Sequence, residues 1–230
     1  MNQSFRTGAK AAIPPCLGVI PVGISIGLLG VQTGLRVWET ILMSALVMAG
    51  SSELLVIGML GQGAAMSAMI VGTFFINLRH IVMSSSVMQR LQGTPLSRRL
   101  LGAFALCDES FAVFSMSEDH SFAFLMGANT ALYSSFVLST AVGSLLTGFL
   151  PQIVVDSFGI AFYAAFLGLL LPGIKHHSRL ILLVLITALL NWGLQLLIPA
   201  SWAIILAMVL GALIGVWLVE DETDKEEEAV

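Results

Sequence analysis

Charged residues are scarce in this chain. Only 10% of its 230 residues are Asp, Glu, Lys or Arg, against about 25% in a typical soluble domain, whereas 57% are hydrophobic. A soluble protein of this size could not hide so much apolar surface, because its exterior must face water. The composition therefore excludes a soluble globular domain and indicates a chain that lies in the lipid bilayer.

Cysteine and metal-binding patterns are also scarce. Cys16 and Cys107 both lie in apolar segments, where they are expected to be small buried hydrophobes and not a disulfide. No CxxC or HExxH pattern occurs, and no basic stretch suits a nucleic acid. We therefore expect no cofactor, no metal, no nucleic acid and no enzymatic activity.

The apolar residues form runs of about 20, the length at which a helix spans the hydrocarbon core. Barrel strands would need an alternation of apolar and polar residues that is missing here. The sequence predicts an all-α, polytopic transmembrane helical bundle of seven or eight segments. One membrane domain covers residues 1–219, and an acidic, disordered tail covers residues 220–230. The segments are 12–30, 38–60, 64–88, 97–117, 121–147, 157–173, 179–197 and 201–219.

Interrupted or re-entrant helices are expected in this bundle. Basic residues cluster near positions 6–10, 90–99 and 175–179, and the positive-inside rule would place all three clusters in the cytoplasm. Eight simple crossings cannot do so, because three segments lie between successive clusters. An odd number of crossings would put successive clusters on opposite sides of the membrane. The first segment, with three prolines and four glycines, is the best candidate for a break, and the fourth is the second candidate. No internal repeat is evident.

Polar groups inside these segments mark candidate functional residues, because each one costs free energy in lipid. Asn77, Arg79 and His80 lie in the third segment. Arg79 has no charge partner nearby in sequence. Its guanidinium could hold a substrate carboxylate, or it could extend to the interface or pair with a structural acid.

Acidic side chains supply the opposite charge. Asp108 and Glu109 are adjacent in the fourth segment, where mutual repulsion and loss of water favour protonation of one of them. They could carry a coupled proton, bind a substrate ammonium group, or simply pair with Arg79.

A third cluster lies in the second segment, where small and polar residues precede an acid: Gly50, Ser51, Ser52 and Glu53. These residues could contact a ligand or could serve helix packing alone. Arg79 together with the intramembrane acids offers both charges needed to hold a zwitterion.

At these residues the sequence resembles the AzlC family, the large subunits of two-component branched-chain amino acid exporters. The resemblance runs from Phe5 to Met116 and more weakly to Trp217, through Asn77-Leu78-Arg79-His80 and Asp108-Glu109-Ser110. At the position of Glu53 the family often has Gln.

Membership would imply export of leucine, isoleucine and valine, with methionine as a further candidate, from the bacterial cytoplasm across the inner membrane. It would also imply coupling to protons and a small AzlD-type membrane subunit as partner. Two alternatives stay open. One is a channel for ions or other small solutes, and the other is a non-transporting membrane assembly subunit.

Overall fold

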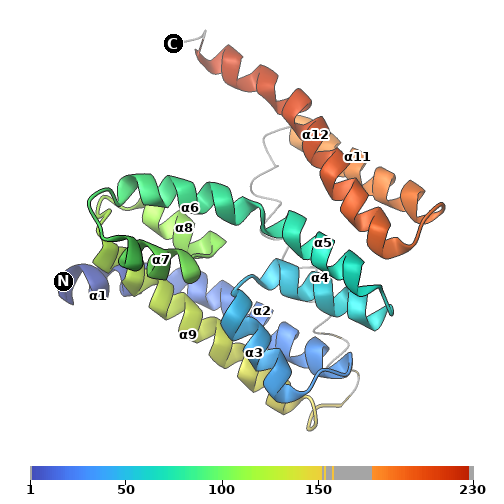
Figure 1. The fold of residues 1–230 in the computed structure, drawn as a ribbon, viewed down its shortest axis with the longest axis horizontal. Coiled ribbons are helices and arrows are strands. Elements are labelled where there is room, and N and C mark those ends of the chain that lie inside the picture. Colours follow the sequence, from blue (N-terminus) through green and yellow to red (C-terminus); the bar gives the residue numbers. More distant parts are fainter. Residues whose placement is uncertain (1, 152, 154–156, 158–177, 228–230) are drawn as a thin grey trace.

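The computed structural model describes residues 2–151, 153, 157 and 178–227, and all regular structure in this part of the chain is helical. The sixth predicted segment lies almost entirely outside the described residues. The helices are α1 (Asn2–Ala11), α2 (Ile13–Gln32), α3 (Val37–Val47), α4 (Gly50–Gly61), α5 (Met66–Asn77), α6 (Arg79–Arg90), α7 (Leu96–Phe104), α8 (Asp108–Met116), α9 (Phe122–Leu146), α11 (Ser178–Gln195) and α12 (Ala200–Glu227) (Figure 1).

Among the described residues, four helical stretches are long and apolar enough to cross a membrane. They are Ile13–Gln32, Met66–Arg90, Phe122–Leu146 and Ala200–Leu218. The second of them joins α5 and α6 through Leu78. Helices α3, α4 and α11 are apolar but shorter. These lengths confirm the prediction of an all-α polytopic membrane protein.

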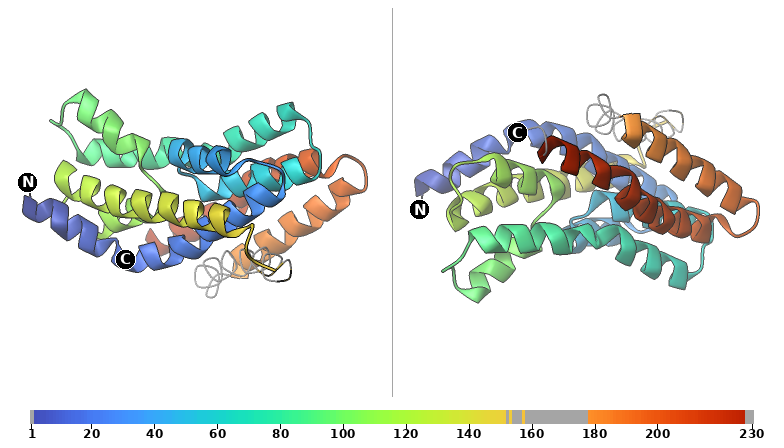
Figure 2. Two further views of the ribbon diagram at one scale, coloured as in Figure 1. Left: turned by 90° about the horizontal axis from the view of Figure 1, so that it is seen from below. Right: turned by 90° about the horizontal axis from the view of Figure 1, so that it is seen from above.

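The core of the bundle is the contact of α9 with α1 and α2, which lie along it in succession (Figure 2). Small residues let the backbones approach closely. A Cβ added to Gly27 of α2 would lie 2.8 Å from the carbonyl carbon of Gly143 in α9. Close approach through small residues is the usual way helices pack in lipid, where apolar side chains gain little by leaving the acyl chains.

Helix α2 is continuous, so the prediction that the first segment is interrupted was wrong. Pro14 and Pro15 lie in its first turn, where backbone N–H groups have no partner within the helix. Pro21 lies inside the helix, and the Ser25 hydroxyl donates a hydrogen bond to its carbonyl oxygen (2.9 Å). Membrane helices tolerate such prolines because neighbouring groups satisfy the backbone.

The second segment is broken instead, and it forms a helical hairpin. Its first arm, α3, begins beside the C-terminal end of α2, where a Cβ on Gly30 would lie 2.7 Å from Cγ2 of Thr40. Its second arm, α4, ends at the same place, where a Cβ on Gly61 would lie 3.2 Å from Cγ2 of Thr33. The α3–α4 hairpin therefore enters and leaves at one end of the bundle.

The fourth segment forms a second hairpin, which confirms its predicted interruption. Arg90, at the end of α6, donates to the Ser115 carbonyl near the end of α8 (3.2 Å). Arg99, near the start of α7, donates to the Met88 carbonyl in α6 (3.5 Å). The α7–α8 hairpin therefore starts and ends beside the C-terminal end of α6, opposite the α3–α4 hairpin (Figure 1).

These hairpins explain the distribution of basic residues near positions 6–10 and 90–99. Helix α1, which carries Arg6 and Lys10, packs against the beginning of α9. Nη1 of Arg90 lies 2.8 Å from Nε2 of His120, which precedes the start of α9. Because neither hairpin crosses the bundle, both clusters lie at one end, as the re-entrant alternative required.

A separate hairpin of α11 and α12 packs on α5 through α12 (Figure 1). A Cβ on Gly211 would lie 2.9 Å from Cγ2 of Thr187, so the two helices are also in close contact. The bounds of α12 include Glu220–Glu227, where the sequence predicted a disordered tail.

Candidate functional site

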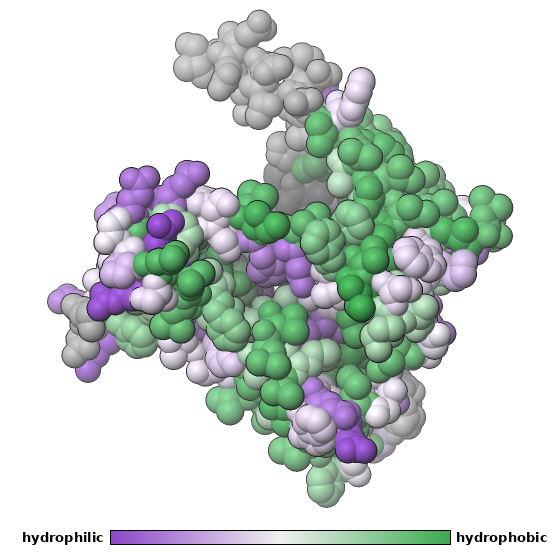
Figure 3. All heavy atoms as spheres, in the orientation of Figure 1, coloured by the Kyte–Doolittle hydropathy of each residue, from purple (hydrophilic) through white to green (hydrophobic). Residues whose placement is uncertain are grey.

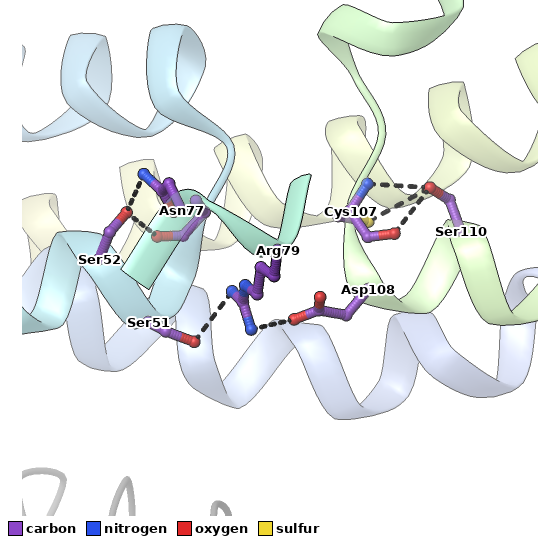
Figure 4. Close-up of polar contacts among 8 residues, drawn as sticks. Ser51, Ser52, Asn77, Arg79, Cys107, Asp108 and Ser110 are labelled. Carbon is purple, nitrogen blue, oxygen red and sulfur yellow. Dashed lines mark hydrogen bonds and ion pairs between the residues drawn. The ribbon is translucent and has the colours of Figure 1, made fainter. Parts of the chain in front are cut away.

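Three helices begin close together at the centre of the bundle. The tip of the α3–α4 hairpin starts α4 at Gly50, the tip of the α7–α8 hairpin starts α8 at Asp108, and the bend at Leu78 starts α6 at Arg79 (Figure 4). The first backbone N–H groups of a helix lack partners within it and carry partial positive charge. The two hairpin tips thus bring the first N–H groups of α4 and α8 to one point, whereas α6 continues from α5 through Leu78, whose backbone is helical.

Arg79 connects the two hairpin tips. Its Nη1 lies 2.6 Å from Oδ2 of Asp108, and its Nη2 donates to the Ser51 hydroxyl (3.2 Å) (Figure 4). The Arg79 side chain is 36% exposed and that of Asp108 is 47% exposed, so the ion pair borders open space. A small polar ligand could therefore reach both charges.

The open space is a cavity of about 380 Å³ between these helices. This volume falls in the range of small-molecule sites, roughly 300–1,000 Å³. Its lining consists of Val19, Val22, Met48, Ala49, Gly50, Ser51, Arg79, His80, Cys107, Asp108, Glu109, Ala112 and Phe136.

The lining is divided by chemistry. Helices α4, α6 and α8 supply its polar side chains, whereas α2 and α9 supply only apolar ones, namely Val19, Val22 and Phe136. Figure 3 shows hydrophilic atoms gathered at the centre of a largely hydrophobic face. The cavity therefore matches a solute with a charged end and an apolar end.

The structure brings six of the nine predicted site residues to this cavity, and they are Gly50, Ser51, Arg79, His80, Asp108 and Glu109. Ser52, Glu53 and Asn77 lie outside its lining. Asn77 donates to the Ser52 hydroxyl (3.2 Å), which in turn donates to the Ala49 carbonyl (2.9 Å). These contacts tie the bend after α5 to the α3–α4 hairpin.

Glu53 is buried, with 1% of its surface exposed. Its Oε2 accepts a hydrogen bond from the Ser44 hydroxyl of α3, and its Oε1 accepts one from the Ala49 N–H (3.2 Å). Met48, just before, has a left-handed φ of 50°. Glu53 thus joins both arms of the hairpin where its backbone changes direction.

Replacing Glu53 by Gln should preserve this hairpin, whereas replacing it by Ala should destabilise it. A Gln carbonyl can accept from the Ala49 N–H, and its amide can donate to Ser44. Ala would leave two buried polar groups without partners, at about 1–3 kcal/mol each. Thermal unfolding of the purified protein in detergent measures the difference, with Glu118→Ala as an exposed control. Equal destabilisation by Gln and Ala would show that the negative charge is what matters.

The sequence did not single out two residues of the hairpin tips, Met48 and Cys107, as site residues, or the particular residues that form the apolar wall. The tips are apolar, and their only sequence signal is the small or polar residue that begins the next helix. The sequence does not distinguish the apolar wall, because valine and phenylalanine also occur on surfaces that face lipid.

Ser25 lies within a Gly-x-Ser-x-Gly pattern, Gly23–Gly27, which can mark a nucleophilic serine. That role requires a sharp strand-to-helix turn, whereas Ser25 is buried in the middle of α2 and bonds to the Pro21 carbonyl. The pattern here serves the contact of α2 with α9.

The fold and the cavity define a class of protein. Broken helices whose ends meet in mid-bundle around charged side chains are typical of membrane transport proteins. The chain belongs to the AzlC family, because the family model "AzlC protein" matches residues 14–150. The predicted resemblance is thereby confirmed.

Relatives place the chain among membrane proteins. A protein of Archaeoglobus fulgidus described as an uncharacterized membrane protein is 35% identical over 181 residues, covering 77% of this chain and 80% of the relative. The inner membrane protein YgaZ of Escherichia coli is 26% identical over 193 residues, covering 78% of this chain and 77% of YgaZ.

A third relative carries a functional name. The branched-chain amino acid transport protein AzlC of Bacillus subtilis is 31% identical over 111 residues, which cover 48% of this chain and 43% of that protein. No solved structure shows a significant match.

Proposed function

We propose that this chain is the substrate-binding subunit of a secondary transporter that exports small amino acids with branched apolar side chains. The observation that carries the proposal is the divided cavity, with an arginine and two acids on one side and an apolar wall on the other. An amino acid zwitterion has the same division, with two charges at one end and a side chain at the other.

The substrate carboxylate would bind Arg79 and the N-terminal end of α4. Guanidinium forms two parallel hydrogen bonds with a carboxylate, and a helix N-terminus adds backbone donors and positive charge. Ser51, which now accepts from Arg79, lies beside both. The substrate ammonium group would bind Asp108.

In this scheme the substrate replaces an existing ion pair. Nη1 of Arg79 and Oδ2 of Asp108 lie 2.6 Å apart and form an ion pair. A zwitterion offers each of them a new partner of the correct sign, so neither charge is left unpaired. A solute with one charge would leave the other partner without an ion pair.

Glu109, the second acid in the lining, would carry the coupled proton. The name of the Bacillus subtilis relative supports branched-chain amino acids as substrates. By the same family resemblance, we propose a bacterial cytoplasmic membrane location and a small AzlD-type partner subunit.

The test is efflux of labelled leucine from preloaded cells that express this chain, with and without a candidate small partner. Saturable efflux is expected, and Asp108→Asn should reduce its initial rate by about tenfold or more, since a hydrogen bond to a charged group contributes about 1.5–3 kcal/mol. Glu118→Gln, which removes an exposed acid outside the cavity, should transport normally.

Three outcomes would contradict the proposal. Unsaturable flux would indicate a channel, and normal efflux from Asp108→Asn would move the substrate site elsewhere. No efflux of any amino acid from a well-inserted complex would point to an assembly subunit.

A further inference from the structure

We infer that Gly50 and Phe136 together set the upper size of the side chain that the cavity accepts. The inference rests on the proposed function and extends it to the residues that determine specificity. Gly50 begins α4 on the polar side, and Phe136 belongs to the apolar wall on α9. Both line the cavity where its two sides meet.

The space in front of Gly50 is narrow but unfilled. A Cβ at this position would lie 3.3 Å from Cγ1 of Val22, 3.6 Å from Cε2 of Phe136 and 3.7 Å from Cδ1 of Ile26. All three neighbours are side-chain atoms, and Gly50 does not have the left-handed backbone that disfavours other residues. Alanine therefore fits once the Val22 side chain shifts by a few tenths of an ångström, and its methyl group would occupy space between α4 and the wall.

The position of this space matters for the substrate. Ser51, next to Gly50, contacts the guanidinium that would hold the substrate carboxylate. In an amino acid only one carbon separates the carboxylate from the start of the side chain. A side chain anchored in this way must pass close to Gly50 before it reaches the apolar wall, so a methyl group there competes with its first branch.

Phe136 limits the opposite side. Its ring is 4% exposed and is held by the packing of α9 against α2. The hydrophobic core that contains Phe136 also contains Val19, Ile26 and Met48. A smaller residue at position 136 would leave space that the neighbours fill only in part, and the cavity would lengthen toward α9.

The experiment compares unlabelled alanine, valine, leucine and phenylalanine as competitors of labelled valine counterflow in membrane vesicles containing the full complex. Gly50→Ala should weaken competition by leucine at least about tenfold relative to alanine, the effect of one methyl group in a close-fitting pocket. Phe136→Leu should enlarge the cavity, so that larger side chains compete better and phenylalanine becomes a competitor. Val22→Ala, which shortens a neighbouring wall residue, should act like Phe136→Leu.

Gly58→Ala is the matched control, because it makes the same change in the same helix where no atom lies within 4 Å of the new methyl group. It should leave the order of competitors unchanged. Normal wild-type counterflow with an unchanged leucine-to-alanine ratio in Gly50→Ala would overturn the size inference alone. Absence of any amino acid counterflow in the wild type would instead remove the proposed function and this inference with it.

Discussion

Replacing Arg79 with Gln is expected to abolish leucine transport while leaving the protein folded and inserted. The substitution removes the guanidinium that lines the cavity and leaves Asp108 without its partner at 2.6 Å. Each hydrogen bond to a charged group contributes about 1.5–3 kcal/mol, and a substrate carboxylate loses two of them, so the rate should fall at least about a hundredfold. The initial rate of labelled leucine counterflow measures it, and size-exclusion chromatography in detergent checks the fold.

Two further variants separate charge from geometry. Arg79→Lys keeps the charge but cannot form two parallel bonds to a carboxylate, so it should transport weakly. Arg98→Gln removes an exposed arginine outside the cavity and should transport normally.

The double variant Arg79→Gln with Asp108→Asn distinguishes binding from structure. If the ion pair served assembly alone, removing both charges together would relieve the unpaired partner and restore transport. If the pair binds the substrate, the double variant stays inactive. Recovery of flux in the double variant would therefore refute the proposed role of Arg79.

The sequence was sufficient to predict the helical membrane class and much of the site. Long apolar runs have one physical solution in lipid, and charges within them must face protein or water. Arg79 and Asp108, which are 29 positions apart in numbering, were expected to act together on charge alone, and the structure places them in contact.

The location of the breaks was harder to predict. Prolines suggested a break in the first segment, yet Pro14 and Pro15 lie where a helix needs no N–H donor. The break in the second segment, at Met48 and Ala49, contains no proline and was not predicted. It depends on hydrogen bonds from residues distant in sequence, such as Asn77 to Ser52, and on the buried carboxylate of Glu53.

Glu53 shows how a candidate residue can also have a structural role. The predicted contact with a substrate or a coupled proton stays a prediction, and the structure places both oxygens of Glu53 in hydrogen bonds within one hairpin, outside the cavity lining. A Gln at this position could make the same two hydrogen bonds, so these contacts do not require the negative charge.

The two hairpins also reveal an order that the sequence hides. Helix α2 is followed by a hairpin at its C-terminal end, and α5 with α6 is followed by a hairpin at theirs (Figure 1). The two units run in opposite directions, an arrangement found in transporters with inverted repeats. Their similarity lies in backbone path and not in side chains. The hydrogen bonds at the hairpin tips also use different side chains. Before α4, the Glu53 carboxylate accepts from the Ala49 N–H. Before α8, the Ser110 hydroxyl accepts from the Cys107 N–H.

Replacing Gly27 with Val is expected to destabilise the whole bundle, unlike any change in the cavity. A Cβ on Gly27 would meet the backbone of α9, lying 2.8 Å from the Gly143 carbonyl carbon, and backbone cannot move aside as a side chain can. Overpacking costs about 3 kcal/mol at the upper end of its usual range. For a chain of this size that lowers the melting temperature by roughly 6–12 °C.

Gly18→Val is the matched control for Gly27→Val, because it introduces the same residue in the same helix where no atom lies within 4 Å. Thermal unfolding in detergent should separate the two variants, and only Gly27→Val should lose monodisperse protein. Transport should fall with Gly27→Val because less folded protein is present, and with Arg79→Gln although the stability of the fold is kept. Equal stability of the two valine variants would mean that α2 and α9 can separate without cost, and the cavity would then lack a rigid apolar wall.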